Sequence, residues 1–325
     1  MLISPIKLAV CCMLVFGGTA VWGQSPNQIF SPSQRGNSDS RPDRAGYALA
    51  LAEGLYDNGI IDLAVRDNLV YCGMGDGLMI LDISDPATPS LVSRIRFQEE
   101  IGSDLKLLGD HVYMTAYATS FESSTFRAIE VSDPEVPFAA GTYTLGSAAP
   151  GLDVVDSLAF VTTSESIGGF NAMFILNIVD PENIVVLDSV ATDNWPYKVR
   201  VRDNSAYVTG VYLDIIDISD PSEATVLSQF SPDIDYQPWD LDFRENDSLL
   251  YVADLGSIWP VYWSALSVYN VADPENPSLW GRFPLAAYVA DVKVKGDYAY
   301  VSNGSCGLQV FDISDPTSPD SVGRY

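Results

Sequence analysis

Five aspartates recur at similar places along the chain, each near the start of a short stretch in which apolar residues alternate: they are Asp62, Asp104, Asp153, Asp240 and Asp291. A sixth place of the same kind holds Lys198. Crowded carboxylates repel one another unless a cation, a proton or a hydrogen-bond donor lies between them, and oxygen ligands suit Ca²⁺. Two interpretations stay open: a bound Ca²⁺, or aspartates that accept hydrogen bonds from backbone amides and join one repeat to the next.

Aromatic residues are the second group that could bind a partner. They lie in segments of variable length between the apolar stretches: Trp195, Tyr197, Trp239, Trp259, Tyr262 and Trp263. Tryptophan and tyrosine at a surface serve as interface anchors and as platforms for sugar rings. They predict a surface that binds a protein or a polysaccharide. The alternative is that the rings pack on one another and cover the ends of the strands.

No group of residues forms a recognisable catalytic site. The single histidine, His111, has no second histidine to accompany it. A zinc site of the usual kind therefore has too few ligands, and a Ser-His-Asp triad would depend on that residue alone. No Gly-rich phosphate loop leads from a strand into a helix, so nucleotide binding is unsupported. We assign no catalytic residue.

The candidate residues belong to a repeated unit. Its two clearest copies are LMILDISDPATP at residues 78–89 and LQVFDISDPTSP at residues 308–319. Looser copies end in the same Asp-Pro pair, and the six aspartates of these pairs are 40 to 53 positions apart: Asp85, Asp133, Asp180, Asp220, Asp273 and Asp315. A period of this length indicates stacked supersecondary units. The carboxylates of these pairs are expected to form turns by accepting local amide hydrogen bonds.

Each unit contains four short segments with a period of two, the pattern of β-strands. Turn pairs such as Asp67-Asn68 and Gly296-Asp297 join the first segment to the second. The third segment is apolar on both faces, so both faces should be buried, and the Asp-Pro pair ends it because proline donates no backbone hydrogen bond. The pattern predicts an all-β fold, a β-propeller of six four-stranded blades. A seven-bladed propeller and a truncated array are the alternatives.

Three of the third segments carry a family resemblance: LMILD at 78–82, LDIID at 213–217 and LQVFD at 308–312, each followed by Ile-Ser-Asp-Pro. They resemble the LVIVD-repeat family of secreted or surface-exposed bacterial and archaeal proteins, which are expected to form β-propellers. The resemblance covers roughly residues 47–325 and weakens where the final Asp is lost, at 126–130, 173–177 and 266–270. It implies architecture and location, and no activity.

The N-terminal residues divide into two segments. Residues 1–23 have a positive charge at Lys7, an apolar run and a small-residue exit, which predicts a secretory signal peptide cleaved before Gln24. The run is too short and too broken by glycine for a membrane span. Residues 24–46 are polar and rich in Pro and Ser, which indicates a disordered linker. Residues 47–325 are assigned to the propeller, in which residues 47–55 form an extra outer strand or residues 320–325 complete the last blade.

The charge and the cysteines restrict the partners and the compartment. A net charge of −26 argues against nucleic acid and anionic lipid surfaces. Cys72 and Cys306 lie in the first and last repeats. If the ring closes, a disulfide between them is one interpretation, and a buried free Cys72 is the other, because Cys72 matches apolar residues in the other repeats.

These observations predict a secreted or cell-surface (periplasmic) protein, monomeric and without catalytic activity, that binds a protein or polysaccharide through its aromatic loop face. One alternative is a Ca²⁺-dependent hydrolase of an ester, lactone or glycoside, by analogy with other propeller enzymes. The other is a structural module of a cell-envelope assembly.

Overall fold

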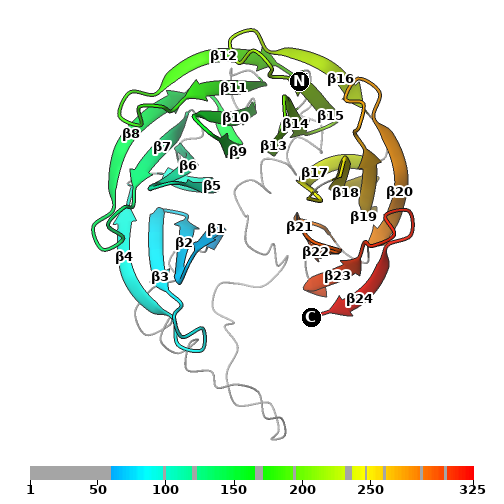
Figure 1. Ribbon diagram of the computed structural model, residues 1–325, viewed down its shortest axis with the longest axis horizontal. Helices are drawn as coiled ribbons and strands as arrows, with labels where there is room; N and C mark the ends of the chain where they lie inside the picture. Colours follow the sequence, from blue (N-terminus) through cyan, green and yellow to red (C-terminus); the bar gives the residue numbers. More distant parts are fainter. Residues whose placement is uncertain are drawn as a thin grey trace, which may run out of the picture.

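The computed structural model describes residues 60–97, 100–118, 123–164, 171–192, 195–230, 236–245, 247–258, 261–285, 288–303 and 306–325. This part of the chain forms six antiparallel sheets, each made of four consecutive strands. Figure 1 shows the sheets arranged as blades around a common axis, with the first strand of each blade innermost and the fourth outermost. The protein is an all-β, six-bladed propeller, as the sequence predicted.

The first three blades comprise β1 (Ile60–Arg66), β2 (Leu69–Met74), β3 (Gly77–Asp82) and β4 (Ser90–Arg96); β5 (Glu100–Leu108), β6 (His111–Ala118), β7 (Ser124–Glu130) and β8 (Phe138–Leu145); and β9 (Ala148–Val155), β10 (Leu158–Ser164), β11 (Ala172–Asn177) and β12 (Val185–Ala191). The last three comprise β13 (Val199–Arg202), β14 (Ser205–Thr209), β15 (Leu213–Asp217) and β16 (Thr225–Phe230); β17 (Tyr236–Phe243), β18 (Leu249–Ile258), β19 (Val261–Asn270) and β20 (Ser278–Leu285); and β21 (Asp291–Lys295), β22 (Tyr298–Ser302), β23 (Leu308–Asp312) and β24 (Asp320–Arg324).

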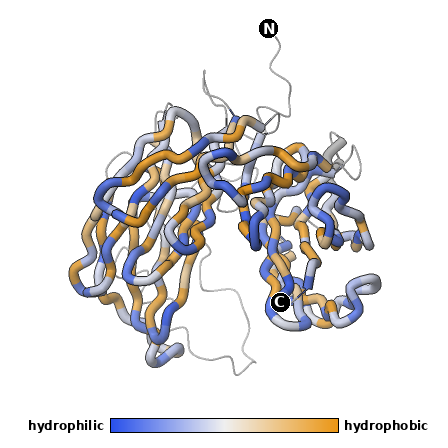
Figure 2. Tube along the Cα trace, turned by 45° about the horizontal axis from the view of Figure 1, so that its top comes forward, coloured by the Kyte–Doolittle hydropathy of each residue, from blue (hydrophilic) through white to orange (hydrophobic). Residues whose placement is uncertain are grey.

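The blades pack face to face through apolar side chains. Since successive side chains of a strand point to opposite faces, a strand that is apolar throughout can contact both neighbouring blades. Five core clusters result, and each contains residues of two successive blades. An aromatic residue of the second strand is buried in each of these five cores: Tyr71, Tyr113, Phe160, Tyr207 and Tyr251. Figure 2 shows apolar stretches along the strands and hydrophilic residues at many turns.

One end of the propeller has the same turn structure in every blade. The residue after the third strand donates a backbone hydrogen bond to the turn between the first two strands, as from Ile83 N to Asn68 O at 2.7 Å and from Ile313 N to Asp297 O at 2.8 Å. The Asp of each Asp-Pro pair accepts from the amide two residues later; Ala87 N lies 3.0 Å from Asp85 Oδ1. The same bond recurs at Asp133, Asp180, Asp220, Asp273 and Asp315. These aspartates form turns, as predicted.

The two described cysteines are not joined. Cys72 is a buried free thiol and Cys306 is free and half-buried, so the second interpretation of the cysteines is the one observed. Burial raises the pKa of the Cys72 thiol to about 11. Within the described ranges, no helix is long and apolar enough to cross a membrane.

Candidate binding face and axial ion-pair network

The predicted aspartates lie in the inner strands, near the axis, but the strand register separates one of them from the rest. Asp62, Asp104, Asp240 and Asp291 pair with equivalent residues of the second strands, which are Gly73, Thr115, Ala253 and Ser302. In the third blade, the equivalent residue of the second strand is Thr162, and it pairs with Gly151. Asp153 lies two positions further along β9, where it pairs with Phe160. The sequence comparison therefore matched Asp153 with the wrong position of the repeat. The reason is that residues two apart in a strand lie on the same face, so either could be matched with the aspartates of the other blades.

The aspartates accept backbone hydrogen bonds from the next blade. Leu105 N donates to Asp62 Oδ2 at 3.0 Å, and Leu152 N donates to Asp104 Oδ2 at 3.0 Å. Val292 N donates to Asp240 Oδ2 at 3.0 Å. Asp153 and Asp242, which occupy equivalent positions two residues further along their strands, accept similar bonds. Val201 N donates to Asp153 Oδ2 at 2.7 Å, and Val294 N donates to Asp242 Oδ2 at 2.8 Å. These carboxylates therefore join successive blades, as the second interpretation proposed.

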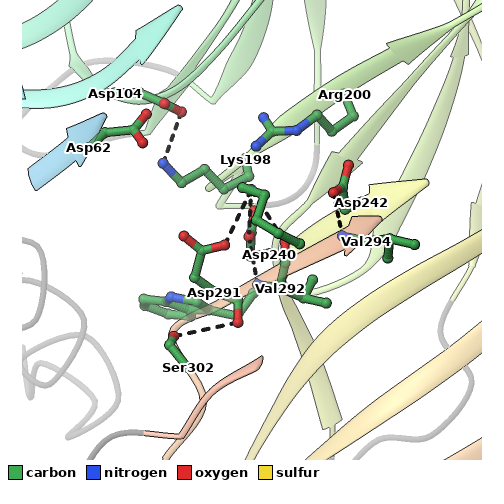
Figure 3. A network of polar contacts seen from close by, with 12 residues as sticks. Asp62, Asp104, Lys198, Arg200, Asp240, Asp242, Asp291, Val292, Val294 and Ser302 are labelled. Atoms are coloured by element: carbon green, nitrogen blue, oxygen red, sulfur yellow. Dashed lines mark hydrogen bonds and ion pairs between the residues drawn. The ribbon is translucent and has the colours of Figure 1, made fainter. Parts of the chain in front are cut away.

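Ammonium groups lie beside the same carboxylates. Figure 3 shows Lys198 between the Asp62–Asp104 pair and the Asp240–Asp291 pair. Its Nζ is 2.8 Å from Asp104 Oδ2, and the Nζ of Lys106 is 3.4 Å from Asp104 Oδ1. Lys293 Nζ lies 3.2 Å from Asp291 Oδ1 and 3.6 Å from Asp240 Oδ2. Among the described residues, no three His, Cys, Asp or Glu side chains are arranged as a metal-ligand set.

Within each of the two carboxyl pairs, Asp62–Asp104 and Asp240–Asp291, one pKa is raised and the other is lowered. Burial, together with the neighbouring Asp104, raises the pKa of Asp62 to about 6. Burial alone would raise the pKa of Asp104 as well, but Lys106 and Lys198 hold it well below its usual range. The second pair behaves alike: burial and Asp240 raise the pKa of Asp291 to about 7, whereas Lys293 and Arg200 lower that of Asp240 despite its burial. Below about pH 6, each pair therefore holds one protonated and one ionised carboxyl group.

The aromatic residues gather over the last three blades, at the end where the inner strands begin. Tyr197 and Trp239 have ring centroids 4.4 Å apart, and Tyr288 lies 6.1 Å from Trp239. Tyr197 is buried, with 3% of its surface exposed, whereas Trp239 and Tyr288 are half-buried. We call these three residues, each from a successive blade, the axial aromatic group. Their rings pack on one another and still offer part of their surface to solvent.

A second aromatic group lies within the fifth blade. Tyr236 and Trp263 have ring centroids 6.2 Å apart, and the guanidinium of Arg282 lies 3.9 Å from the centre of the Tyr236 ring. Of the other predicted binding residues, Trp195 is half-buried just before β13. Trp259 lies outside the described residues, and Tyr262 lies in β19 with only its backbone described.

Sequence reasoning did not identify Asp254, which lies beneath this second group. Its side chain is fully buried, and it accepts hydrogen bonds from Ser267 Oγ and, at 3.3 Å, from Tyr269 Oη. Arg282 Nη2 lies 3.6 Å from Asp254 Oδ2. Burial raises the pKa of Asp254 to about 6. The available signal was an acidic residue within the otherwise apolar strand of residues 249–255, where a charge needs a buried partner.

The fold and this site define a class: a six-bladed β-propeller whose inner strands are joined by aspartates and whose last three blades present aromatic residues near the axis. The chain carries LVIVD repeats, as the sequence predicted, because the family model described as "LVIVD repeat" matches residues 61–96, 197–231 and 286–325. No curated protein matches the sequence.

Several solved structures share the fold. A functionally unknown protein from Desulfotomaculum acetoxidans has a TM-score of 0.64 at 13% identity over 81% of this chain and 78% of its own. A protein from Lactobacillus plantarum has a TM-score of 0.63 at 10% identity over 81% and 83%. The WD40 domain of Pan2 from Neurospora crassa has a TM-score of 0.58 at 14% identity over 85% and 82%. At such identities the similarity concerns the fold alone.

Proposed function

We propose that the protein is a secreted or cell-surface propeller without catalytic activity that binds a protein or polysaccharide through its aromatic end. The observation that carries the proposal is the gathering of the axial aromatic group and the Tyr236–Trp263–Arg282 group at the same end of three successive blades. Partly exposed aromatic rings held on rigid strands provide large contact area at low entropic cost.

The net charge of the protein restricts the kind of partner that it can bind. With a net charge of −26, the protein would repel acidic polysaccharides and acidic proteins at low salt. A neutral polysaccharide or a basic protein surface fits better. The part of the proposal that concerns secretion rests on the signal-peptide pattern of residues 1–23 alone. N-terminal sequencing of the exported protein would check cleavage before Gln24.

The test compares three tryptophan variants. Trp239→Ala and Trp263→Ala remove one ring from each aromatic group, whereas Trp280→Ala removes an exposed tryptophan from the outer strand β20. Binding is measured against neutral polysaccharides (cellulose, chitin, xylan and β-glucan) and by pull-down from the native secretome. Loss of a hot-spot ring is expected to weaken binding about tenfold or more, with Trp280→Ala unchanged. Equal binding by all three variants would reject the aromatic end as the binding surface.

The hydrolase alternative gains no support from the arrangement of charges, because lysines lie beside the carboxylates that would hold Ca²⁺. Calcium binding itself stays a prediction. Calorimetric titration of Ca²⁺ into protein treated with EDTA decides it, since a metal at the axis should give a heat of binding and raise the melting temperature.

A further inference from the structure

The first blade carries half of an interblade core. Each of the five junctions between neighbouring blades contains apolar residues of both blades. A sixth cluster comes from the first blade alone; it consists of Cys72, Met74 and Met79, with Val70 and Leu81 packed against it. We call these five residues the half-core.

The half-core lies on the face that other blades turn toward the preceding blade. Cys72 occupies the position of Met114 in the second blade, since Cys72 pairs with Leu63 just as Met114 pairs with Leu105. Met114 lies in the core between the first and second blades. The residues at this position in the later blades also lie in cores shared with the preceding blade: Val161, Val208, Val252 and Val301.

The half-core is buried although no blade precedes it. Cys72, Met74 and Met79 have exposed fractions of 1%, 0% and 4%. The open face of the last blade is different, because Tyr298 and Tyr300 there are 43% and 38% exposed. An uncovered sheet face in this propeller therefore shows large exposed fractions, and the low values at the half-core require a covering group.

The cover extends over part of the face only. Leu63 and Val65 of the inner strand β1 point to the same face as Cys72 and are 54% and 55% exposed. A complete blade would bury them, as it buries the equivalent Leu105 to 2%. A single extended segment over β2 and β3 accounts for buried side chains there and exposed ones at β1.

The chain supplies one such segment just before β1. In residues 47–52, Tyr47, Leu49 and Leu51 alternate with three alanines, so an extended chain would place its large apolar groups on one face. Residues 57–59 read Asp-Asn-Gly, a turn sequence that lets the chain reverse before Ile60. Nine extended residues span about 30 Å, several times the ~4.8 Å between neighbouring strands. We propose that residues 47–55 pack on the half-core and take the place of a preceding blade.

Thiol labelling tests the contact, because Cys72 lies in the half-core. Replacing Cys11, Cys12 and Cys306 with Ser leaves Cys72 as the only thiol of the full chain. Its reaction with a maleimide at pH 8 should be slow, since burial both blocks access and suppresses the thiolate. The double substitution Leu49→Asp and Leu51→Asp is expected to raise the labelling rate at least tenfold. The matched control places two aspartates in residues 24–46, at Ile29 and Phe30, and should leave the rate unchanged.

Two results would overturn the proposal. One is a labelling rate unchanged by Leu49→Asp and Leu51→Asp, or raised equally by the control. The other is protection of Cys72 that is lost on dilution, which would assign the cover to a second copy of the chain. Hydrogen exchange of the unsubstituted protein gives a check that does not depend on a variant folding. Amides of residues 47–55 should exchange at least tenfold more slowly than those of residues 24–46, and equally fast exchange in both segments would reject the contact.

Discussion

At the residue scale, the axial network depends on a lysine that replaces an aspartate. Lys198 occupies the position of Asp62 and Asp240 in its blade, and its ammonium lies 2.8 Å from Asp104 Oδ2, across the axis. Asp104 is 1% exposed in its side chain, so its charge has little access to water. It needs the cations near it, and Lys198 is the nearer of the two lysines that contact it.

We expect Lys198→Met to destabilise the protein by roughly 3 kcal/mol, because removing one member of a buried ion pair leaves the other charge uncompensated. Urea unfolding followed by tryptophan fluorescence measures the change. Lys295→Met, at the exposed end of β21, is the matched control and should change the free energy of unfolding by less than about 0.5 kcal/mol. A similar small effect of Lys198→Met would show that Asp104 is held by its amide donors and Lys106 alone.

Asp254 predicts a dependence of stability on pH. Its pKa is raised by burial from 3.8 to about 6, so the folded protein binds a proton that the unfolded chain releases. This contribution is complete below about pH 4 and is lost as the pH rises through 6, with a magnitude on the order of 2–3 kcal/mol. Asp62 and Asp291, with pKa values raised to about 6 and about 7, act in the same direction.

Unfolding free energies at pH 4.5 and pH 8 check this expectation. The unsubstituted protein should be more stable at pH 4.5, and Asp254→Asn should reduce the difference because an amide does not titrate. Below pH 4 the free energy of unfolding should instead fall as the pH falls, since the pKa values of Asp104 and Asp240 are lowered in the folded protein and their protonation is therefore destabilising. A protein that is more stable at pH 8 than at pH 4.5 would contradict the assignment.

At the element scale, the Asp-Pro turn is the most repeated feature of the chain. Asp220 accepts from the amide and hydroxyl of Ser222, at 3.0 and 2.6 Å, and its carbonyl accepts from Glu223 N at 3.1 Å. Asp220→Ala is expected to lower the melting temperature of the protein, because the turn loses a local acceptor of backbone hydrogen bonds. Asp220→Asn should retain most of that stability, since the amide oxygen also accepts. Equal losses for both variants in thermal unfolding would assign the effect to charge.

These turns also explain why the blades could be predicted from the sequence. The Asp-Pro pair ends the third strand in every unit, and the apolar alternation before it fixes which faces are buried, so both features are local. The site was less predictable. The position of Asp153 depended on strand register, and the roles of Lys198 and Arg282 depend on residues of other strands. Distances across an axis, from one blade to another, have no counterpart in sequence spacing.

At the scale of the whole molecule, the described residues of the six blades form five apolar junctions, and the two outer faces differ. The first blade's face is buried at Cys72 and Met79, and the last blade's face is exposed at Tyr300. Figure 1 shows the first blade (β1–β4) and the last blade (β21–β24) at the two ends of the ring. The repeat uses the same residue types at every junction, so an exposed tyrosine in the last blade reflects its position in the ring, and the sequence of the repeat alone does not predict it.

One pair of substitutions tests whether the place of a blade in the ring, and not the residue type, decides how much a side chain contributes to stability. Tyr251 and Tyr300 occupy the same place in their blades, yet Tyr251 is 0% exposed in the core between the fifth and sixth blades and Tyr300 is 38% exposed. Tyr251→Ala is expected to cost about 3–5 kcal/mol, the usual effect of emptying a large buried site, whereas Tyr300→Ala should cost less than about 1 kcal/mol. Thermal and urea unfolding of the two variants measure the contrast. Equal costs would mean that the last blade packs directly on the first in solution and that the ring closes with six junctions, because only a sixth junction would bury Tyr300 as the other five bury its equivalents.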